Sequence, residues 1–225
     1  MEVRMVRIHA RHVATVFIGL VLTIGMSGVT RAQLGGRPAE TWITSLERPE
    51  RIAGLKVDEI IGRLDLKPGQ VVADIGAGPG LFSFALAKAV GPAGKVYAEE
   101  VDQAFVDHIK RKLLEQHVTN VQPVLGAFTD PRLPAEVDMA FFHDVLHHIA
   151  DRPGFLKALA PSVKAAGRIA IVEYDAVKGP HNAAPALQVT KEQLDAWMAD
   201  IGFKPIQRID DLFTDARWFV IYGRK

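Results

Sequence analysis

A glycine-rich segment after a short apolar run is the part of this sequence best suited to chemistry. It reads Val71-Val72-Ala73-Asp74-Ile75-Gly76-Ala77-Gly78-Pro79-Gly80, and apolar residues at helical spacing follow from Leu81 onward. Glycine at the end of a strand allows unusual backbone dihedrals and lets a ligand approach the main chain. The N-terminus of the next helix adds free N–H groups. The segment therefore predicts a ligand-binding loop at a strand-to-helix turn.

The spacing of the glycines and the residue before them indicate the kind of ligand. A tight turn without a ligand is one alternative, because short glycine motifs also occur by chance. A dinucleotide site is another, but its third glycine stands one position later than Gly80 does here. Asp74 would repel a pyrophosphate, whereas it suits a ligand with a cationic amino group and a sulfonium. We therefore expect a cationic ligand.

A second candidate binding residue, Glu100, ends the next apolar run, Lys95–Glu100. In doubly wound folds a carboxylate at this place accepts hydrogen bonds from both hydroxyls of a ribose. Successive residues of a strand point to opposite faces, so Glu99 is expected on the other face as a solvated charge. The sequence thus predicts that replacing Glu100 weakens ligand binding and that replacing Glu99 changes it little.

Titratable residues gather where a later strand ends, in Phe142-His143-Asp144 and then His147-His148. His143 and Asp144 are the first candidates for a general base, because they stand at the strand end itself. His147 and His148 are adjacent and cannot both face one pocket, so capping or packing is the alternative for each. A metal held by His143, Asp144 and His147 is conceivable, but this set supplies only part of a metal's ligands, and no metal site is predicted.

Apolar runs that alternate with helical patterns define the fold class. This alternation is typical of parallel strands joined by crossover helices. Two further strands at the C-terminus are expected to pair antiparallel, and Thr190 with Gln193 predicts a capping box for the helix before them. The expected strands are 71–75, 95–100, 121–125, 137–143, 168–173, 204–210 and 217–222, and the expected helices are 49–64, 81–90, 103–116, 152–160 and 191–201.

Residues 49–225 resemble the class I S-adenosylmethionine-dependent methyltransferases, in particular small bacterial proteins with a methyltransferase domain. The resemblance rests on four segments, namely Val72 to Gly80, Gly94 to Glu100, Asp130 to Pro134 and Asp144 to Ile149. It implies a Rossmann-like, doubly wound α/β fold with a mostly parallel seven-stranded sheet and a C-terminal antiparallel hairpin. It also implies that S-adenosyl-L-methionine binds across the carboxyl ends of the first, second and fourth strands.

The resemblance assigns parts of the cofactor to residues of this sequence. Asp74 and the loop Gly76, Ala77, Gly78 and Gly80 would face the methionine part, Glu100 would hold the ribose, and Ala127 with Phe128 would lie against the adenine. Many relatives have an aspartate in place of Ala127, so this chain lacks the usual acceptor for the adenine amino group. Backbone groups or Asp130 are the alternatives.

Other side chains are expected near the acceptor of the methyl group. Tyr174, beside Glu173 and Asp175 at the end of the fifth strand, could line the acceptor pocket. Trp42 and Arg48 could close over the site, although packing is the commoner role for a single tryptophan.

The first 32 residues resemble an export signal. Three arginines precede an uncharged stretch over residues 13–30, and Thr30-Arg31-Ala32 offers small residues at the two positions read for cleavage. A membrane anchor is an alternative, because 18 uncharged residues reach the lower end of a bilayer span, and a buried helix is another. The expected organisation is a signal or anchor over 1–32, a linker over 33–48 and one domain over 49–225, exported or held at a membrane.

Charge and composition narrow the function. Residues 1–32 hold four of the 27 basic and one of the 26 acidic residues, which leaves 23 against 25. A nearly neutral domain argues against a nucleic-acid partner, and the absence of cysteine excludes disulfides and thiolate chemistry. We expect a methyltransferase acting on a small molecule. The alternative is a non-catalytic binder of a nucleoside or of a protein partner on the same fold, because an exported enzyme lacks an evident supply of cofactor.

Overall fold

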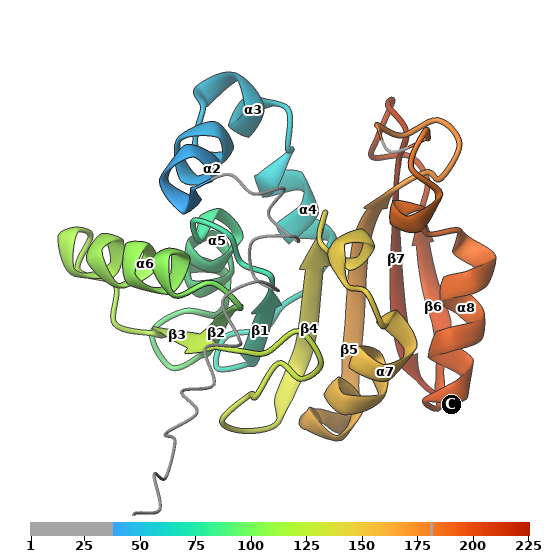
Figure 1. The fold of residues 1–225 in the computed structure, drawn as a ribbon. Helices are drawn as coiled ribbons and strands as arrows, with labels where there is room; N and C mark the ends of the chain where they lie inside the picture. The colour runs from blue at the N-terminus through green and yellow to red at the C-terminus, as the bar shows by residue number, and fades with distance from the viewer. Residues whose placement is uncertain (1–37, 181) are drawn as a thin grey trace, which may run out of the picture.

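The computed structural model describes residues 38–180 and 182–225. Within these ranges the chain forms one sheet with helices on both faces (Figure 1). The sheet consists of β1 (Val71–Ile75), β2 (Lys95–Glu100), β3 (Val121–Leu125), β4 (Val137–His143), β5 (Val163–Tyr174), β6 (Phe203–Ile209) and β7 (Arg217–Arg224). Their order in the sheet is β3-β2-β1-β4-β5-β7-β6. Strands β1 to β5 are parallel, and β7 is antiparallel to β5 and β6, as predicted.

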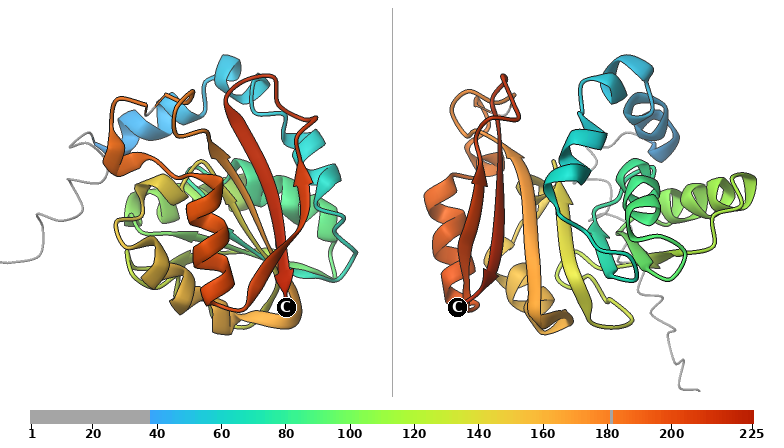
Figure 2. Two further views of the ribbon diagram at one scale, coloured as in Figure 1. Left: turned by 90° about the vertical axis from the view of Figure 1, so that its right-hand side faces the viewer. Right: turned by 180° about the vertical axis from the view of Figure 1, so that it is seen from behind.

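Each face of the sheet is covered by its own helices (Figure 2). Helices α5 (Leu81–Val90) and α6 (Gln103–Glu115) pack on one face together with α4 (Val57–Arg63). Helices α7 (Arg152–Leu159) and α8 (Lys191–Asp200) pack on the other. Alternating strand residues supply the two cores, since Ile169 and Ile171 join the α7 and α8 side whereas Ala170 and Val172 join the opposite side.

The predicted strands and crossover helices agree closely with the structure. The first four strands have the expected bounds, and β5 begins five residues earlier than the expected Arg168, at Val163. The capping box is confirmed, because the Thr190 hydroxyl accepts the Gln193 N–H while the Gln193 side chain accepts the Thr190 N–H. Local patterns of this kind are visible without tertiary information.

The segment before β1 differs from the prediction in two ways. Residues 39–46, expected in a linker, form helix α2 (Ala39–Leu46). The expected single helix over 49–64 is broken into α3 (Pro49–Ala53) and α4, because Lys56 adopts a left-handed conformation with a φ of 53°. The Lys56 ammonium donates to the Leu212 carbonyl at 2.6 Å, and Leu55 is buried at the break. Apolar periodicity continues across both helices, so the pattern does not reveal the break.

The predicted signal or anchor over residues 1–32 lies outside the described residues, as does the start of the predicted linker. Among the residues that are described, no helix has both the length and the apolar character needed to cross a membrane.

Candidate functional site

The glycine loop forms the floor of a pocket at the carboxyl ends of the strands. It connects β1 to α5, and Gly76, Gly78 and Gly80 have φ values of 65°, 55° and 88°. Gly76 must also lack a side chain for reasons of space, because a Cβ there would lie 2.2 Å from the Val145 Cγ2. The loop therefore has this shape only with glycine at these positions.

We expect Gly76→Ala to lower the free energy of unfolding by about 2–5 kcal/mol, since left-handed strain and overpacking each cost on the order of 1–3 kcal/mol. Gly69→Ala is the matched control, because Gly69 has a φ of 88° and a Cβ there would have open space around it for 4 Å. It should cost about 1–2 kcal/mol through strain alone. Urea unfolding of both variants measures the difference, and equal losses would mean that Val145 does not restrict the loop.

Asp74 is a buried carboxyl directly before this loop. It is 3% exposed, lines the pocket, and accepts a hydrogen bond from the Ser83 hydroxyl at 2.6 Å. Burial raises the pKa of Asp74 to about 7, Glu100 adds to the rise, and the bond from Ser83 opposes it. A cation bound beside Asp74 would therefore favour its ionised form near neutral pH.

Glu100 lies in the pocket wall, where the sequence places a ribose acceptor. Its Oε1 accepts the Gly78 N–H at 2.9 Å and its Oε2 accepts the Val101 N–H at 2.8 Å. Burial raises the pKa of Glu100, and these backbone hydrogen bonds oppose the rise. Glu100 thus stabilises the glycine loop through the Gly78 N–H and also faces the pocket.

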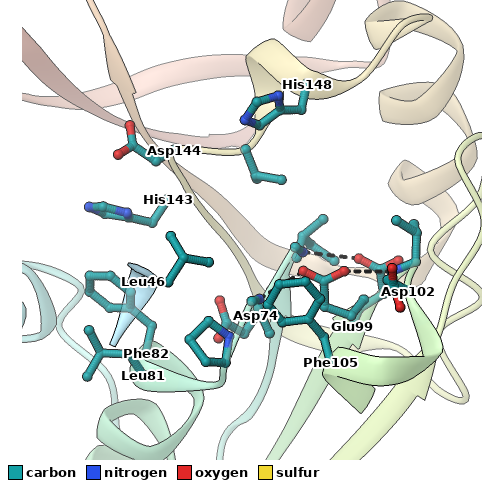
Figure 3. Close-up of a pocket in the computed structure, with 18 of the residues that line it drawn as sticks. Leu46, Asp74, Leu81, Phe82, Glu99, Asp102, Phe105, His143, Asp144 and His148 are labelled. Atoms are coloured by element: carbon teal, nitrogen blue, oxygen red, sulfur yellow. Dashed lines mark hydrogen bonds between the residues drawn. The ribbon is translucent and has the colours of Figure 1, made fainter. Parts of the chain in front are cut away.

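The prediction that Glu99 is solvated is wrong. Glu99 is the register partner of Ile75 in the β1–β2 pair. Its side chain lies on the opposite face of the sheet from Glu100, as alternation requires, but it is only 1% exposed. Its Oε2 accepts the Gly76 N–H at 3.1 Å, and its carboxyl also lines the pocket (Figure 3). The loop after β3 covers this face, because a Cβ on Gly126 would lie 1.8 Å from the Glu99 Oε1.

The loop expected to bind adenine contributes one aromatic ring, that of Phe128, to the pocket. Phe128 lines the pocket, whereas Ala127 forms a pair of backbone hydrogen bonds with Asp130 at 2.8 and 3.1 Å. The Asp130 carboxylate accepts the Arg132 N–H at 2.7 Å. Asp130, one alternative for the adenine amino group, therefore already has a local hydrogen bond.

His143 and Asp144 lie together on one side of the pocket, across from Asp74 and Glu99 (Figure 3). The His143 ring stacks on Phe82 with centroids 4.4 Å apart, and no described residue offers its buried Nε2 a hydrogen bond. Burial lowers the pKa of His143 to about 3, and the nearby cations Arg217 and Arg51 lower it further. His143 is therefore neutral at physiological pH and is a weak base.

Asp144 is better placed as a base. It follows β4 in a left-handed conformation with a φ of 58°, and its Oδ1 is buried without a hydrogen-bond partner in the described part of the chain. Burial raises the pKa of Asp144 to about 7, with a further rise from Glu173 and an opposing effect from His147. A carboxylate that titrates near neutrality and faces a pocket can accept a proton from a bound acceptor.

The two adjacent histidines take different positions. His147 is buried, and its Nδ1 lies 2.8 Å from the Glu173 Oε1, while its backbone N–H donates to the Glu173 Oε2 at 3.1 Å. His148 is exposed and lines the pocket. Ligand atoms of Asp144, His147 and Glu173 lie within 4.8 Å of one another, so Glu173, not His143, completes the possible cation-binding set. Hydrogen bonds to His147 and to the Tyr174 N–H account for the position of Glu173.

Side chains from α2 and α3 line the outer part of the pocket. Trp42 and Leu46 come from α2, and Arg51 comes from α3. Arg48, predicted to close over the site, instead bonds to Ser45 at 3.4 Å. Tyr174, predicted to line the acceptor pocket, has its ring 5.9 Å from the Arg217 guanidinium. The sequence carried no signal for Leu46 and Arg51, because they reach the pocket only through tertiary packing.

Part of the sequence is similar to known methyltransferases. Residues 72–167 match the family model described as a methyltransferase domain. An uncharacterised 37.1 kDa protein in transposon Tn4556 of Streptomyces fradiae is 32% identical over 117 residues, which are 52% of this chain and 33% of that protein. The ubiquinone/menaquinone biosynthesis C-methyltransferase UbiE of Burkholderia mallei is 25% identical over 140 residues, 62% of this chain and 57% of the relative. The chain thus spans less than two thirds of either protein.

Comparisons of structure define the fold. A SAM-dependent methyltransferase from Aquifex aeolicus has a TM-score of 0.73 and 21% identity, over 84% of this chain and 100% of that one. Magnesium protoporphyrin IX methyltransferase from Synechocystis PCC 6803, solved with bound SAM, has a TM-score of 0.68 and 17% identity, over 88% and 96%. The chain has the Rossmann-like fold of the class I S-adenosylmethionine-dependent methyltransferases.

Proposed function

We propose that this protein is an S-adenosylmethionine-dependent methyltransferase that acts on a small molecule. The observation that carries the proposal is the convergence of three carboxyls, the buried Asp74 and Glu99 and the half-buried Glu100, on one glycine loop. Such a wall favours a cationic ligand and disfavours the phosphates of a dinucleotide. The matches to methyltransferases of known fold support the same cofactor.

The described residues fit the cofactor in separate places. Asp74 would bind the ammonium group of its methionine part, and Glu100 would accept hydrogen bonds from the ribose hydroxyls. Phe128 and Val101 offer apolar contacts for adenine. The open backbone of Gly76 to Gly80 leaves room for the methionine part. When bound, S-adenosylmethionine supplies a methyl group activated by a positively charged sulfur.

The chain's own residues would orient the acceptor and remove its proton. Trp42, Leu46 and Phe82 give the outer pocket an apolar lining that excludes water. Asp144 would take the acceptor's proton on its unpaired Oδ1, and the neutral His143 would offer a hydrogen bond through Nε2. Methyl transfer is an in-line displacement, so alignment and one base are the main tasks of the protein.

Isothermal titration with S-adenosylhomocysteine and, separately, with NAD tests the cofactor. We expect binding of the first and none of the second, and the reverse would contradict the proposal. Transfer of a tritiated methyl group from S-adenosylmethionine to a panel of phenols, carboxylic acids and amines then identifies the acceptor. Transfer to RNA in place of any panel member would contradict a small-molecule acceptor.

We also propose that the protein is exported, on the pattern of residues 4–32 alone. A chain expressed from Met1 should leave the cytoplasm, and its mature form should begin at Gln33. Intact-mass spectrometry of the exported product measures this. Retention of the full mass in a membrane fraction that alkali does not strip would favour an anchor. Full-length protein in the cytoplasm would contradict both.

A further inference from the structure

One carboxylate oxygen of the pocket wall has no hydrogen bond. The Glu99 Oε2 accepts the Gly76 N–H, but the Glu99 Oε1 is buried and has no partner among residues 38–180 and 182–225. Asp74 is bonded to Ser83, and Glu100 is bonded to two backbone N–H groups. A buried acceptor without a donor is costly, and such atoms in a pocket commonly meet a ligand.

The unpaired Glu99 Oε1 lies against the loop that follows β3. A Cβ on Gly126 would lie 1.8 Å from the Glu99 Oε1 and 2.7 Å from its Cδ, so the carboxyl lies directly against the backbone of the loop after β3. The same loop continues through Ala127 to Phe128, which lines the pocket. The Glu99 Oε1 therefore lies at the part of the pocket where the proposed function puts the adenine.

The loop after β3 has no side-chain acceptor at Ala127. Ala127 has only a methyl group there, and its backbone N–H and C=O are both bonded to Asp130. The exocyclic amino group is the only N–H donor on the adenine ring system of the nucleoside. An acceptor is therefore needed from another element.

We propose that the Glu99 Oε1 accepts a hydrogen bond from the adenine amino group. The inference rests on the proposed function, because it assumes an adenosyl ligand. Burial, and then the charge of Glu100, raise the pKa of Glu99 well above its usual range. A donor at Oε1 therefore stabilises the carboxylate more than it would at the surface.

Titration with a pair of ligands that differ only at C6 and N1 of the base tests the inference. S-inosylhomocysteine has a carbonyl oxygen where S-adenosylhomocysteine has the amino group. The wild type should prefer the adenosyl compound by at least about tenfold, since a hydrogen bond to a charged group contributes about 1.5–3 kcal/mol. Glu99→Gln keeps an acceptor for Gly76 but presents an amide N–H₂ to the base, so the preference should disappear or reverse.

Two controls separate this role from others. Glu100→Gln should weaken both ligands by the same factor, because the ribose is common to them. Glu99→Val removes the buried carboxyl altogether and should bind the two ligands about equally; it decides the matter if Glu99→Gln does not fold. An unchanged preference in the Glu99 variants would overturn the inference while the proposed function stands. No binding of S-adenosylhomocysteine by the wild type would instead overturn the proposed function.

Discussion

Replacing Asp144 by Asn should lower the turnover number by about 10²- to 10⁴-fold, the usual contribution of a positioned general base. The affinity for S-adenosylhomocysteine should change less than about twofold, because this product needs no proton removed. The expectation follows from the unpaired, buried Oδ1 of Asp144 and from its position on the pocket wall beside His143. Transfer of a tritiated methyl group to the acceptor found in the panel measures turnover.

The pH dependence of the rate identifies the base independently. The ionised form of Asp144 accepts the proton, and its pKa is about 7. With S-adenosylmethionine kept saturating at every pH, kcat/KM for the acceptor should therefore rise with pH up to about 7 and then level off. Asp144→Asn should remove this rise. His143→Gln is the matched control: the pKa of His143 is about 3, so the rise through pH 7 should persist in that variant.

Two results would contradict this assignment in different ways. Wild-type turnover and pH profile in Asp144→Asn would mean that another group removes the proton. Tight binding of S-adenosylhomocysteine by a wild type that methylates no panel member and no RNA would instead favour the non-catalytic binding protein.

Features carried by local patterns could be predicted from the sequence. The starts of β1, β2 and β4 follow from short runs rich in apolar residues shortly after Gly69, Gly94 and Pro134, and the Thr190 cap follows from a spacing of three residues. The parallel direction of the strands joined by α5, α6 and α7 also follows, because a crossover helix returns the chain to the end of the sheet at which the preceding strand began. These signals lie within a few residues of the features that they predict.

Features that depend on distant contacts could not be predicted. The break between α3 and α4 is accompanied by a bond from Lys56 to Leu212, 156 residues away. The Glu99 side chain lies on the expected side of the sheet, but its burial depends on contacts with the loop at Gly126 and with Gly76. Sequence alternation indicates the direction of a side chain and not what covers it.

The base assignment shows the same limit. His143 and Asp144 are neighbours in sequence and share a pocket, yet burial moves their pKa values in opposite directions, to about 3 and about 7. Glu173 raises the pKa of Asp144 and comes near it because β4 and β5 are paired, with His143 opposite Val172. Both candidates are visible in the sequence, and the packing around them decides which one titrates in the useful range.

Replacing Asp74 by Asn should weaken the binding of S-adenosylmethionine by about ten- to a hundredfold, since losing a charged hydrogen-bond partner costs about 1.5–3 kcal/mol. The ammonium group of the methionine part is the expected partner of Asp74. The ligand 5′-methylthioadenosine lacks that group, so its affinity should change less than about twofold. Isothermal titration of both ligands at pH 8 measures the difference.

The pH dependence of binding gives the same prediction a sharper form. The pKa of Asp74 in the free protein is about 7, raised mainly by burial, and a cationic ligand favours the ionised form. As the pH falls below 7, a proton must leave Asp74 before the ligand pairs with it, so the wild-type affinity should fall by up to about tenfold per pH unit. In Asp74→Asn this decline should be much smaller, because the Asn side chain does not titrate. A decline of the same size in both proteins would show that another carboxyl, such as Glu100, pairs with the ammonium group.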